Sequence, residues 1–479
     1  MSDFDDIDLS HAGARVTGHA HHAVRREAAA LLRLALPLAA TQLAQMAILA
    51  TDTLMLGHLS KEALAAAALG NTVFFFAWLL GCGPANAVPP AIAHVLGEDD
   101  NAIGEVRAVV RMGFWTAAIM VPPLVGVLLA TRPILLFFGQ QPILAANAGL
   151  YMSLLCWGLP FAIIFQVLRS FTSSVGHPLA ALAVMVLAVL FNALGDYALI
   201  FGHFGAPRLG LAGAGIASAC SNLFSAVALL AVCLLMPSLK RYRILSQLSR
   251  RHGPHLKELF RLGIPIGVTT LFEAMLFNSA ALMMGLFGVA TLAAHQIAIT
   301  IPSITFMVPL GIGLAATVRV GLGAGADDAV AARRAGFVAI GIAALFMTVS
   351  SALLLLFPEA IARLWLPEEP PGSPVIALTV TFLHVAAAFQ IVDGLQVTAS
   401  LALRGLKDAR APMWIAGGAY WLCGFPMCLL LGFGFGMKGL GVWLGLAFAL
   451  LVAAAALVWR FHTLSRSQIR ATQPQQQKE

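Results

Sequence analysis

Charged side chains are scarce in this 479-residue chain: Asp, Glu, Lys and Arg make up only 11% of it, against 59% hydrophobic residues. A soluble chain of average composition has about 25% charged residues. Because a soluble fold cannot bury so much apolar surface, the composition excludes a soluble enzyme, a nucleic-acid-binding module and a disordered chain. The apolar residues come in continuous runs and do not alternate with polar ones, which also excludes an outer-membrane β-barrel.

Cysteine is rare as well, with six residues and no Cys-x-x-Cys pair. All six lie inside apolar runs, where free cysteine behaves as a small buried hydrophobic side chain. No group of His or Cys has the clustered pattern that a transition metal requires. We therefore expect no cofactor, and no metal apart from a coupling ion.

The apolar runs predict an all-α integral membrane protein with twelve transmembrane helices, because a helix crosses the bilayer with about 20 apolar residues. The predicted spans are 34–56, 64–93, 112–130, 147–171, 179–201, 211–236, 262–286, 292–318, 336–357, 375–402, 412–434 and 439–459.

The loops between these spans differ in basic charge. If the N-terminus is cytoplasmic, 24 Lys and Arg residues fall on the cytoplasmic side and 5 on the other. Short cytoplasmic loops of membrane proteins carry an excess of Lys and Arg. The bias therefore predicts that both termini are cytoplasmic.

The second half of the chain repeats the first. Residues 31–97 align without a gap onto 259–325, at an offset of 228, with 16 identities in 67 positions. Six spans per half bring both halves into the membrane in the same direction, the arrangement of two-lobed secondary transporters. The predicted organisation is a cytoplasmic polar tail (1–30), an N-lobe (31–236), a cytoplasmic linker (237–261), a C-lobe (262–460) and a cytoplasmic tail (461–479).

Four acidic residues lie within the apolar spans, with no basic partner deep in any predicted span: Asp52, Asp196, Glu273 and Asp393. A carboxylate at the bilayer centre costs about 2.5–3.5 kcal/mol, so such residues are functional candidates. Asn192 is four residues from Asp196 and shares its helix face. We expect one cation site of Asp52, Asn192 and Asp196, and a second of Glu273 and Asp393. Their oxygen atoms suit a hard monovalent cation or a proton.

Other polar and aromatic residues of the spans are candidates for lining a substrate cavity. Under the repeat Gln45 falls on Glu273, so the two lobes place an amide and an acid at equivalent heights. A cavity lined by acids attracts cations and repels anions. The cavity candidates are Gln42, Gln45, Asn278, Phe389, Gln390 and Gln396.

Four segments together carry a family resemblance. They are LALPLAATQLAQMAILATDTLMLG in the first span, FNALGDYALIFG in the fifth, GIPIGVTTLFEAMLFN in the seventh and FQIVDGLQVTASLALRGLKDARAP through the tenth. Over roughly residues 30–460 the chain resembles the multidrug and toxic compound extrusion (MATE) family, in its bacterial NorM-like branch.

The resemblance implies a transporter of the bacterial inner membrane with two six-helix lobes. It implies export of small organic cations, such as drugs and dyes, in exchange for Na+ or H+ by alternating access. The residues that match the family's cation-coupling positions are Asp52, Asn192, Asp196, Glu273 and Asp393. Phe389 stands where some members carry a tyrosine. We expect a monomer that contacts membrane lipid and no nucleic acid.

Three other functions fit the residues less well. A flippase for a lipid-linked saccharide, from the related superfamily, would need Arg or Lys in its cavity to bind phosphates, and no basic residue is predicted deep in a span. An integral-membrane transferase or protease would need a converging catalytic cluster at a membrane face, and none is evident, so we expect no enzyme. A passive channel does not require carboxylates in both lobes.

Overall fold

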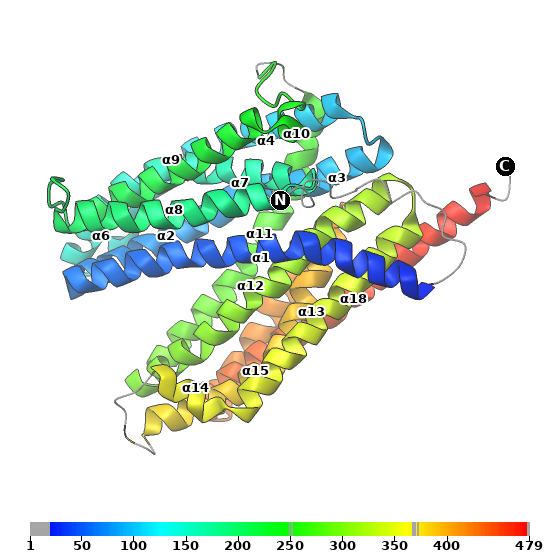
Figure 1. The fold of residues 1–479 in the computed structure, drawn as a ribbon. Helices are drawn as coiled ribbons and strands as arrows, with labels where there is room; N and C mark the ends of the chain where they lie inside the picture. The colour runs from blue at the N-terminus through cyan, green and yellow to red at the C-terminus, as the bar shows by residue number, and fades with distance from the viewer. Residues whose placement is uncertain (1–19, 249, 251, 366–369, 371–372, 477–479) are drawn as a thin grey trace. The chain divides into compact units, whose positions relative to one another are not determined.

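The computed structural model describes residues 20–248, 250, 252–365, 370 and 373–476 (Figure 1). Within these residues, which contain helices and no strands, twelve helical segments are long and apolar enough to span a membrane. Each predicted span falls within one of these segments or overruns it by one residue. The structure therefore confirms an all-α, multi-pass membrane protein.

Internal contacts divide the chain into two units. Of the described residues, unit 1 contains 40–267, and unit 2 contains 20–39 together with 268–476. Both boundaries lie inside a helix, two residues after Pro37 in one case and two residues after Pro265 in the other. The two boundaries are 228 residues apart, the same offset as in the sequence repeat, so they fall at equivalent positions of the two repeats. The predicted lobes, by contrast, begin and end close to the ends of the predicted spans, and three of these boundaries, at 31, 262 and 460, lie inside α1, α11 and α18.

Unit 1 holds the first six spans except the start of the first. Its elements are the part of α1 (Ala20–Leu59) from Ala40 on, α2 (Lys61–Ala85), α3 (Val88–Glu98), α4 (Ile103–Leu129), α5 (Thr131–Phe137), α6 (Pro142–Leu155), η2 (Cys156–Gly158), α7 (Leu159–Ser174), α8 (Pro178–Phe201), α9 (Leu211–Leu235), α10 (Pro237–Lys240) and the start of α11 (Gly253–Leu286).

Unit 2 holds the last six spans and the start of α1. Its further elements are α12 (Val289–Gly325), α13 (Ala329–Leu356), α14 (Pro358–Trp365), α15 (Pro374–Gly405), α16 (Arg410–Ala416), η3 (Gly417–Gly424), α17 (Phe425–Leu429), η4 (Leu430–Gly434) and α18 (Lys438–Gln476). The segments η3 and η4 are π-helical turns within the eleventh span. Such turns occur frequently at functional sites.

Local sequence explains where several helices begin and end. The Ser60 hydroxyl accepts a hydrogen bond from the Ala63 amide (3.0 Å) and caps α2. Asp328 does the same for α13 by accepting from the Ala331 amide (2.8 Å). Such caps satisfy amides that have no partner within their own helix. Helix α8 ends at Phe201 and is followed by Gly202, whose φ of +79° favours glycine.

Glycines permit close helix contacts at equivalent positions of the two units. A Cβ at Gly83 of α2 would lie 2.4 Å from the Gly263 carbonyl of α11, within unit 1. A Cβ at Gly311 of α12 would lie 2.6 Å from the backbone of Ala39 in α1, within unit 2. Gly83 and Gly311 are aligned by the repeat, so the same tight contact is built twice.

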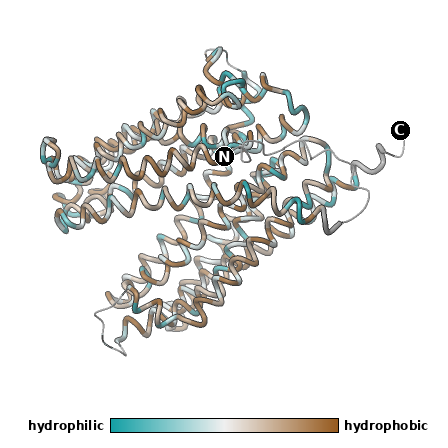
Figure 2. The backbone as a smooth tube through the Cα atoms, in the orientation of Figure 1, coloured by the Kyte–Doolittle hydropathy of each residue, from teal (hydrophilic) through white to brown (hydrophobic). Residues whose placement is uncertain are grey.

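The outer surface of the helices is apolar, as a lipid-facing surface requires. Figure 2 shows hydrophobic residues along the helices and hydrophilic ones mainly toward their ends. Leu282, Trp414 and Leu422 remain between 74% and 79% exposed. Among the cysteines, Cys220 is exposed and Cys423 is half-buried, so the prediction that all six are buried is wrong for these two.

The predicted cytoplasmic segments differ in how far the structure describes them. Residues 1–19 of the predicted N-terminal tail lie outside the described residues, and α1 begins at Ala20. The linker is fixed to unit 1 by α4, where Arg107 Nε donates to the Tyr242 carbonyl (2.7 Å) and Trp115 Nε1 donates to the Leu248 carbonyl (3.0 Å). Helix α11 then begins at Gly253, inside the predicted linker.

Candidate functional site

Three predicted site residues come together in unit 1, and we call them the unit 1 acid cluster: Asp52, Asn192 and Asp196. Helix α1 contributes Asp52, and α8 contributes Asn192 and Asp196 from successive turns. Both α8 residues interact with the Asp52 side chain. Ser218 of α9 donates to Asp52 Oδ2 (2.9 Å), a contact that sequence reasoning missed.

This cluster is buried and poorly satisfied. Asp52 is 5% exposed, and Asn192 and Asp196 are fully buried. Within the described part of the chain, Asp52 Oδ1 and all side-chain polar atoms of Asn192 and Asp196 lack a well-formed hydrogen bond. Two buried carboxylates this close are unstable when both are ionised, unless a proton or a cation lies between them. The cluster therefore has the chemistry of a proton or cation site.

A second group lies in unit 2, and we call it the unit 2 acid cluster: Glu273, Asp393, Gln396, Arg404 and Tyr420. Glu273 comes from α11, the next three from α15, and Tyr420 from η3. Glu273 interacts with Asp393, with the Gln396 amide and with the Arg404 guanidinium. Asp393 is 5% exposed, whereas Glu273 is half-buried. The predicted pair of acids thus meets, with three partners that the sequence did not assign to it.

Arg404 corrects the expectation that the intramembrane acids have no basic partner. The predicted tenth span stops at residue 402, but α15 continues through Gly405 and carries the arginine within the helix. Its interaction with Glu273 offsets part of the negative charge of this cluster. Arg404 is two residues beyond the predicted end of the tenth span, and no glycine or proline before it ends the helix.

Arg169 is a second arginine that differs from expectation, because the charge distribution assigned it to the cytoplasmic end of its span. It lies within α7 and is 5% exposed. Its Nη1 group donates to Gln42 Oε1 and to Gln45 Oε1, the latter at 3.3 Å. Two of the predicted cavity residues are therefore hydrogen-bonded to the guanidinium of a buried arginine in this structure.

Tyrosine gives a signal that could have located both clusters. The chain has four tyrosines, and two of them, Tyr151 and Tyr420, are fully buried. Tyr151 interacts with Asp52 and Asp196 and donates to Asn71 Oδ1 (3.1 Å). Tyr420 interacts with the acids and the amide of the unit 2 acid cluster. A buried tyrosine therefore lies next to the acids of each cluster.

The other predicted cavity residues lie in different environments. Gln390 is fully buried and accepts from Thr305 Oγ1 (3.2 Å) and Ser350 Oγ (3.4 Å). Phe389 is 2% exposed and packs edge-on against Trp443, with ring centroids 5.8 Å apart. Asn278 is exposed, and its amide donates to a carbonyl of its own helix.

No group of three or more His, Cys, Asp or Glu side chains gathers as a metal-binding cluster among the described residues. The acid clusters, each with two carboxylates and neutral oxygen donors, are instead suited to a hard monovalent ion or a proton.

Comparisons with known proteins agree with this architecture. The family model described as MatE matches twice, at residues 37–198 and 265–430. The starts of the two matches are offset by 228 residues, as in the sequence repeat. One family model that fits both halves confirms that repeat.

Bacterial proteins described as multidrug resistance proteins are similar to this chain over most of its length. The probable multidrug resistance protein NorM of Brucella suis is 41% identical over 93% of this chain and 95% of its own length. Multidrug resistance protein NorM of Burkholderia vietnamiensis is 39% identical over 97% of this chain and 100% of its own. A crystal structure of the eukaryotic MATE transporter AtDTX14 shares the fold, with a TM-score of 0.82, 22% identity, and coverage of 93% of this chain and 99% of that one.

The fold, with twelve helices of the described residues that could span a membrane, and the comparisons define a multi-pass membrane transporter. The family model matches more than half of the chain, and the sequence identity to NorM proteins extends over nearly all of it; together they identify the family. This chain belongs to the MATE family, in its bacterial NorM-like branch.

Proposed function

We propose that this protein is a secondary active multidrug exporter, which moves small organic cations out of the cell in exchange for Na+ or H+. The observation that carries the proposal is the pair of buried acid clusters, one in each unit, inside a fold whose relatives are described as multidrug resistance proteins. Buried carboxylates with unsatisfied oxygens bind a cation or a proton reversibly, which is what ion coupling requires.

The coupling follows from competition for the same carboxylates. If an ion and a drug bind with opposing preferences, each weakens the affinity of the other by the same factor. A carboxylate that holds the ion in one state and loses it when the drug enters supplies this opposition. In this proposal Glu273 and Asp393 form the main coupling site, and the unit 1 acid cluster forms the second.

The predicted preference for cationic drugs depends on the net charge of the clusters. Arg404 neutralises part of the unit 2 acid cluster, but two carboxylates remain against one guanidinium. The unit 1 acid cluster has two carboxylates and no basic member. When both carboxylates of a cluster are ionised, negative charge is in excess in either cluster, and it favours lipophilic cations over anions.

The protein is further proposed to be a monomer in the bacterial inner membrane, with both termini in the cytoplasm. Support for this orientation comes from the 24-to-5 distribution of basic residues. Cysteine labelling at Ser246 and at Lys61, on a cysteine-free background, should report opposite sides of the membrane. Labelling of both positions from one side would contradict the topology.

Arg169 favours one alternative, the flippase for a lipid-linked saccharide. A buried guanidinium that contacts neutral amides could bind a phosphate of such a lipid, and a flippase was disfavoured by the sequence only because no such residue was expected. The test is substrate competition in the same vesicles. The proposed exporter transports an ethidium-type dye, and an added polyprenyl phosphate does not inhibit this transport. Failure to transport the dye, or inhibition of dye transport by the polyprenyl phosphate, would favour the flippase.

The experiment that tests the proposal is transport in sealed vesicles that contain the purified protein, with sodium and proton gradients imposed separately. One of the two gradients should drive dye movement well above that of protein-free vesicles. Dye movement that ignores both gradients would contradict secondary active transport.

A further inference from the structure

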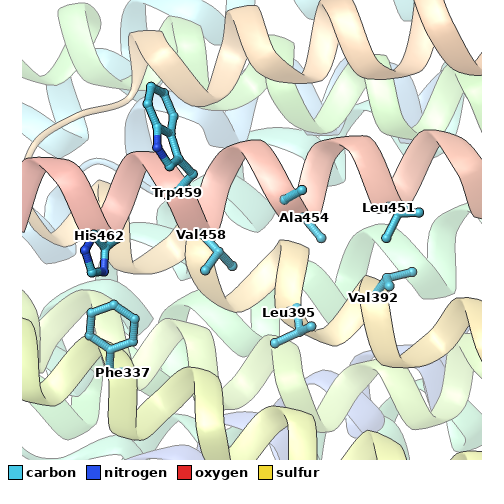
Figure 3. Close-up of a pocket in the computed structure, with 9 residues that line it drawn as sticks. Phe337, Val392, Leu395, Leu451, Ala454, Val458, Trp459 and His462 are labelled. Carbon is cyan, nitrogen blue, oxygen red and sulfur yellow. The ribbon is translucent and has the colours of Figure 1, made fainter.

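An apolar groove lies on unit 2 where α18 crosses α13 and α15. Its volume is about 450 Å³, and its walls include Phe337 of α13, Val392 and Leu395 of α15, and Leu451 and Val458 of α18 (Figure 3). The groove is open along one side. Neither acid cluster contributes a residue to its lining, so its chemistry is separate from that of the proposed coupling sites.

One end of the groove is polar and positively charged. Phe337, Trp459 and His462 all line this end; in Figure 3 Phe337 and His462 lie next to each other, and the Trp459 ring extends from the other side of α18. The Arg333 guanidinium stacks over the Phe337 ring, with Cζ 4.8 Å from its centroid. Arg333 Nη1 donates to the His462 carbonyl (3.0 Å) and to Ser465 Oγ (2.8 Å). Arg333 does not itself line the groove, but these contacts hold its guanidinium against two residues that do, Phe337 and His462.

The hydrogen bonds at this end leave donors for a ligand. Arg333 Nη2 lies 3.1 Å from His462 Nδ1, and because arginine can only donate, the imidazole nitrogen accepts. The Nε2 atom of neutral His462 then carries the proton and is a donor on an exposed ring. The second Nη2 proton of Arg333 is a further donor, since one Nη2 proton is enough for the contact with His462. Both donors belong to residues at the end of the groove that Phe337 and His462 form.

No acid of the described residues forms an ion pair with Arg333. Two acids of the neighbouring helix ends have other partners: Asp328 caps the start of α13, and Asp408 pairs with Arg460 of α18 (2.9 Å). The last turns of α18 add the exposed Arg466. A cationic drug would therefore be repelled from this end, whereas an anionic group would be attracted.

The position along the helices suits the boundary between lipid tails and headgroups. Trp459 is 68% exposed and lies at the polar end of the groove, and tryptophan is enriched at membrane interfaces. The charge bias of the loops predicts that this end, with the α12–α13 connection and the C-terminus, faces the cytoplasm. Basic pockets between helices on that side are suited to anionic lipid headgroups.

We propose that this groove binds an anionic phospholipid of the cytoplasmic leaflet, with one acyl chain along Val392, Leu395 and Leu451 and the phosphate at Arg333 and His462. The apolar walls exclude a fully polar ligand, and the guanidinium, which no carboxylate neutralises among the described residues, selects an anionic headgroup over a zwitterionic one. The site does not depend on the transported substrate.

Quenching of Trp459 fluorescence by brominated acyl chains tests the proposal. The purified protein is placed in phosphatidylcholine vesicles that contain either brominated phosphatidylglycerol or brominated phosphatidylcholine. The signal of a Trp459→Phe variant is subtracted, which isolates the groove from the other tryptophans. We expect phosphatidylglycerol to quench at a roughly fivefold lower mole fraction than phosphatidylcholine, which corresponds to about 1 kcal/mol, the contribution of one basic residue to binding an anionic lipid.

Three variants separate charge from folding. Arg333→Gln should bring the two lipids to equal quenching, whereas Arg333→Lys should retain most of the preference. Arg363→Gln is the matched control, because this exposed arginine of α14 pairs with Glu359 and contributes nothing to the groove. The preference should not change in the control. Loss of preference in the control, or its retention in Arg333→Gln, would overturn the proposal.

A fourth variant tests where the acyl chain lies. Ala455 lines the groove, and Ala455→Phe should fill it and reduce quenching by both lipids. Equal quenching by the two lipids in the wild-type protein would contradict an anionic lipid site. Weak quenching by both would mean that the groove is covered by something else, such as a second copy of the chain, and would contradict it too. Displacement by an ethidium-type dye more readily than by unlabelled phosphatidylglycerol would make it a drug site, and would also overturn the proposal.

Discussion

Gln45 of α1 and Glu273 of α11 occupy equivalent positions of the internal repeat, and each faces a buried or half-buried arginine. In unit 1 Gln45 accepts from Arg169 (3.3 Å), away from the acid cluster that Asp52 and Asp196 form. In unit 2 Glu273 interacts with Arg404 and with Asp393 in a single group.

The difference shows how a repeat can diverge while its helices keep their places. Unit 1 separates its arginine from its acids, so its acid cluster carries two carboxylates with no internal counterion. Unit 2 combines two carboxylates with one guanidinium. The exchange of an amide for an acid at this aligned position is one part of the change; another is Asp52, which falls on Ala280 in unit 2. We therefore expect the two clusters to contribute unequally to ion coupling.

The largest expected effect is the loss of coupling when the acids of unit 2 are neutralised. Asp393→Asn and Glu273→Gln should each lower ion-driven dye efflux by at least about tenfold, which is about 1.4 kcal/mol, because the cation loses its charged ligand. Vesicle transport at matched protein content measures this. Glu359→Gln, which removes an exposed acid paired with Arg363, is the control and should leave efflux unchanged. Efflux at the wild-type rate in both acid variants would mean that these carboxylates are structural.

The aligned glycines should give a large effect on stability in both units. Gly83→Val and Gly311→Val place side-chain atoms against neighbouring backbone, and overpacking of this kind costs about 1–3 kcal/mol. Gly341→Val is the control, because a Cβ there meets no atom within 4 Å. Thermal unfolding followed by size-exclusion chromatography in detergent should rank the control above both variants. A stable Gly83→Val protein would mean that α2 and α11 can separate at little cost.

A smaller effect is expected for Arg404→Gln, which leaves the two carboxylates without their counterion. Efflux should fall several-fold, and the Arg404→Gln variant combined with Glu273→Gln should transport no worse than Glu273→Gln alone. Such non-additivity is the mark of residues that act in one group. Effects that multiply in the double variant would show that Arg404 acts independently of Glu273.

The smallest expected effect is that of Gln45→Glu, which makes unit 1 resemble unit 2 at the aligned position. The new carboxylate accepts from Arg169, and a charge-assisted hydrogen bond of this kind stabilises by about 1 kcal/mol more than its neutral counterpart. A small rise in the unfolding temperature should follow. The Gln42→Glu variant, aimed at the same guanidinium, provides the comparison. A lower unfolding temperature in both would show that Arg169 does not favour an acidic partner.

Most of the fold followed from the sequence because long apolar runs allow few alternatives in a bilayer. The twelve spans and the repeat were predicted, and the family match confirms the repeat. The meeting of Asp52 with Asn192 and Asp196, and of Glu273 with Asp393, was also anticipated. Burying a carboxylate in an apolar span has a high free-energy cost, so the presence of an acid in such a span already marks it as a candidate site residue.

The remaining features depend on contacts that periodicity cannot show. Arg404 was placed outside the tenth span because a hydropathy boundary ends before a charged residue, although the helix continues. The roles of Ser218 and Tyr420 come from helices other than those that carry the acids, so no spacing within one helix reveals them. The unit boundaries inside α1 and α11 likewise depend on tertiary contacts.

The measurement that tests the central claim most directly is the dye affinity of the purified protein with and without Na+, and at two pH values. We predict that one of these ions weakens dye binding in the wild-type protein by at least about fivefold, and that the effect disappears in Asp393→Asn while Glu359→Gln keeps it. A dye affinity that is the same under all conditions would contradict competition between ion and drug at the acid clusters.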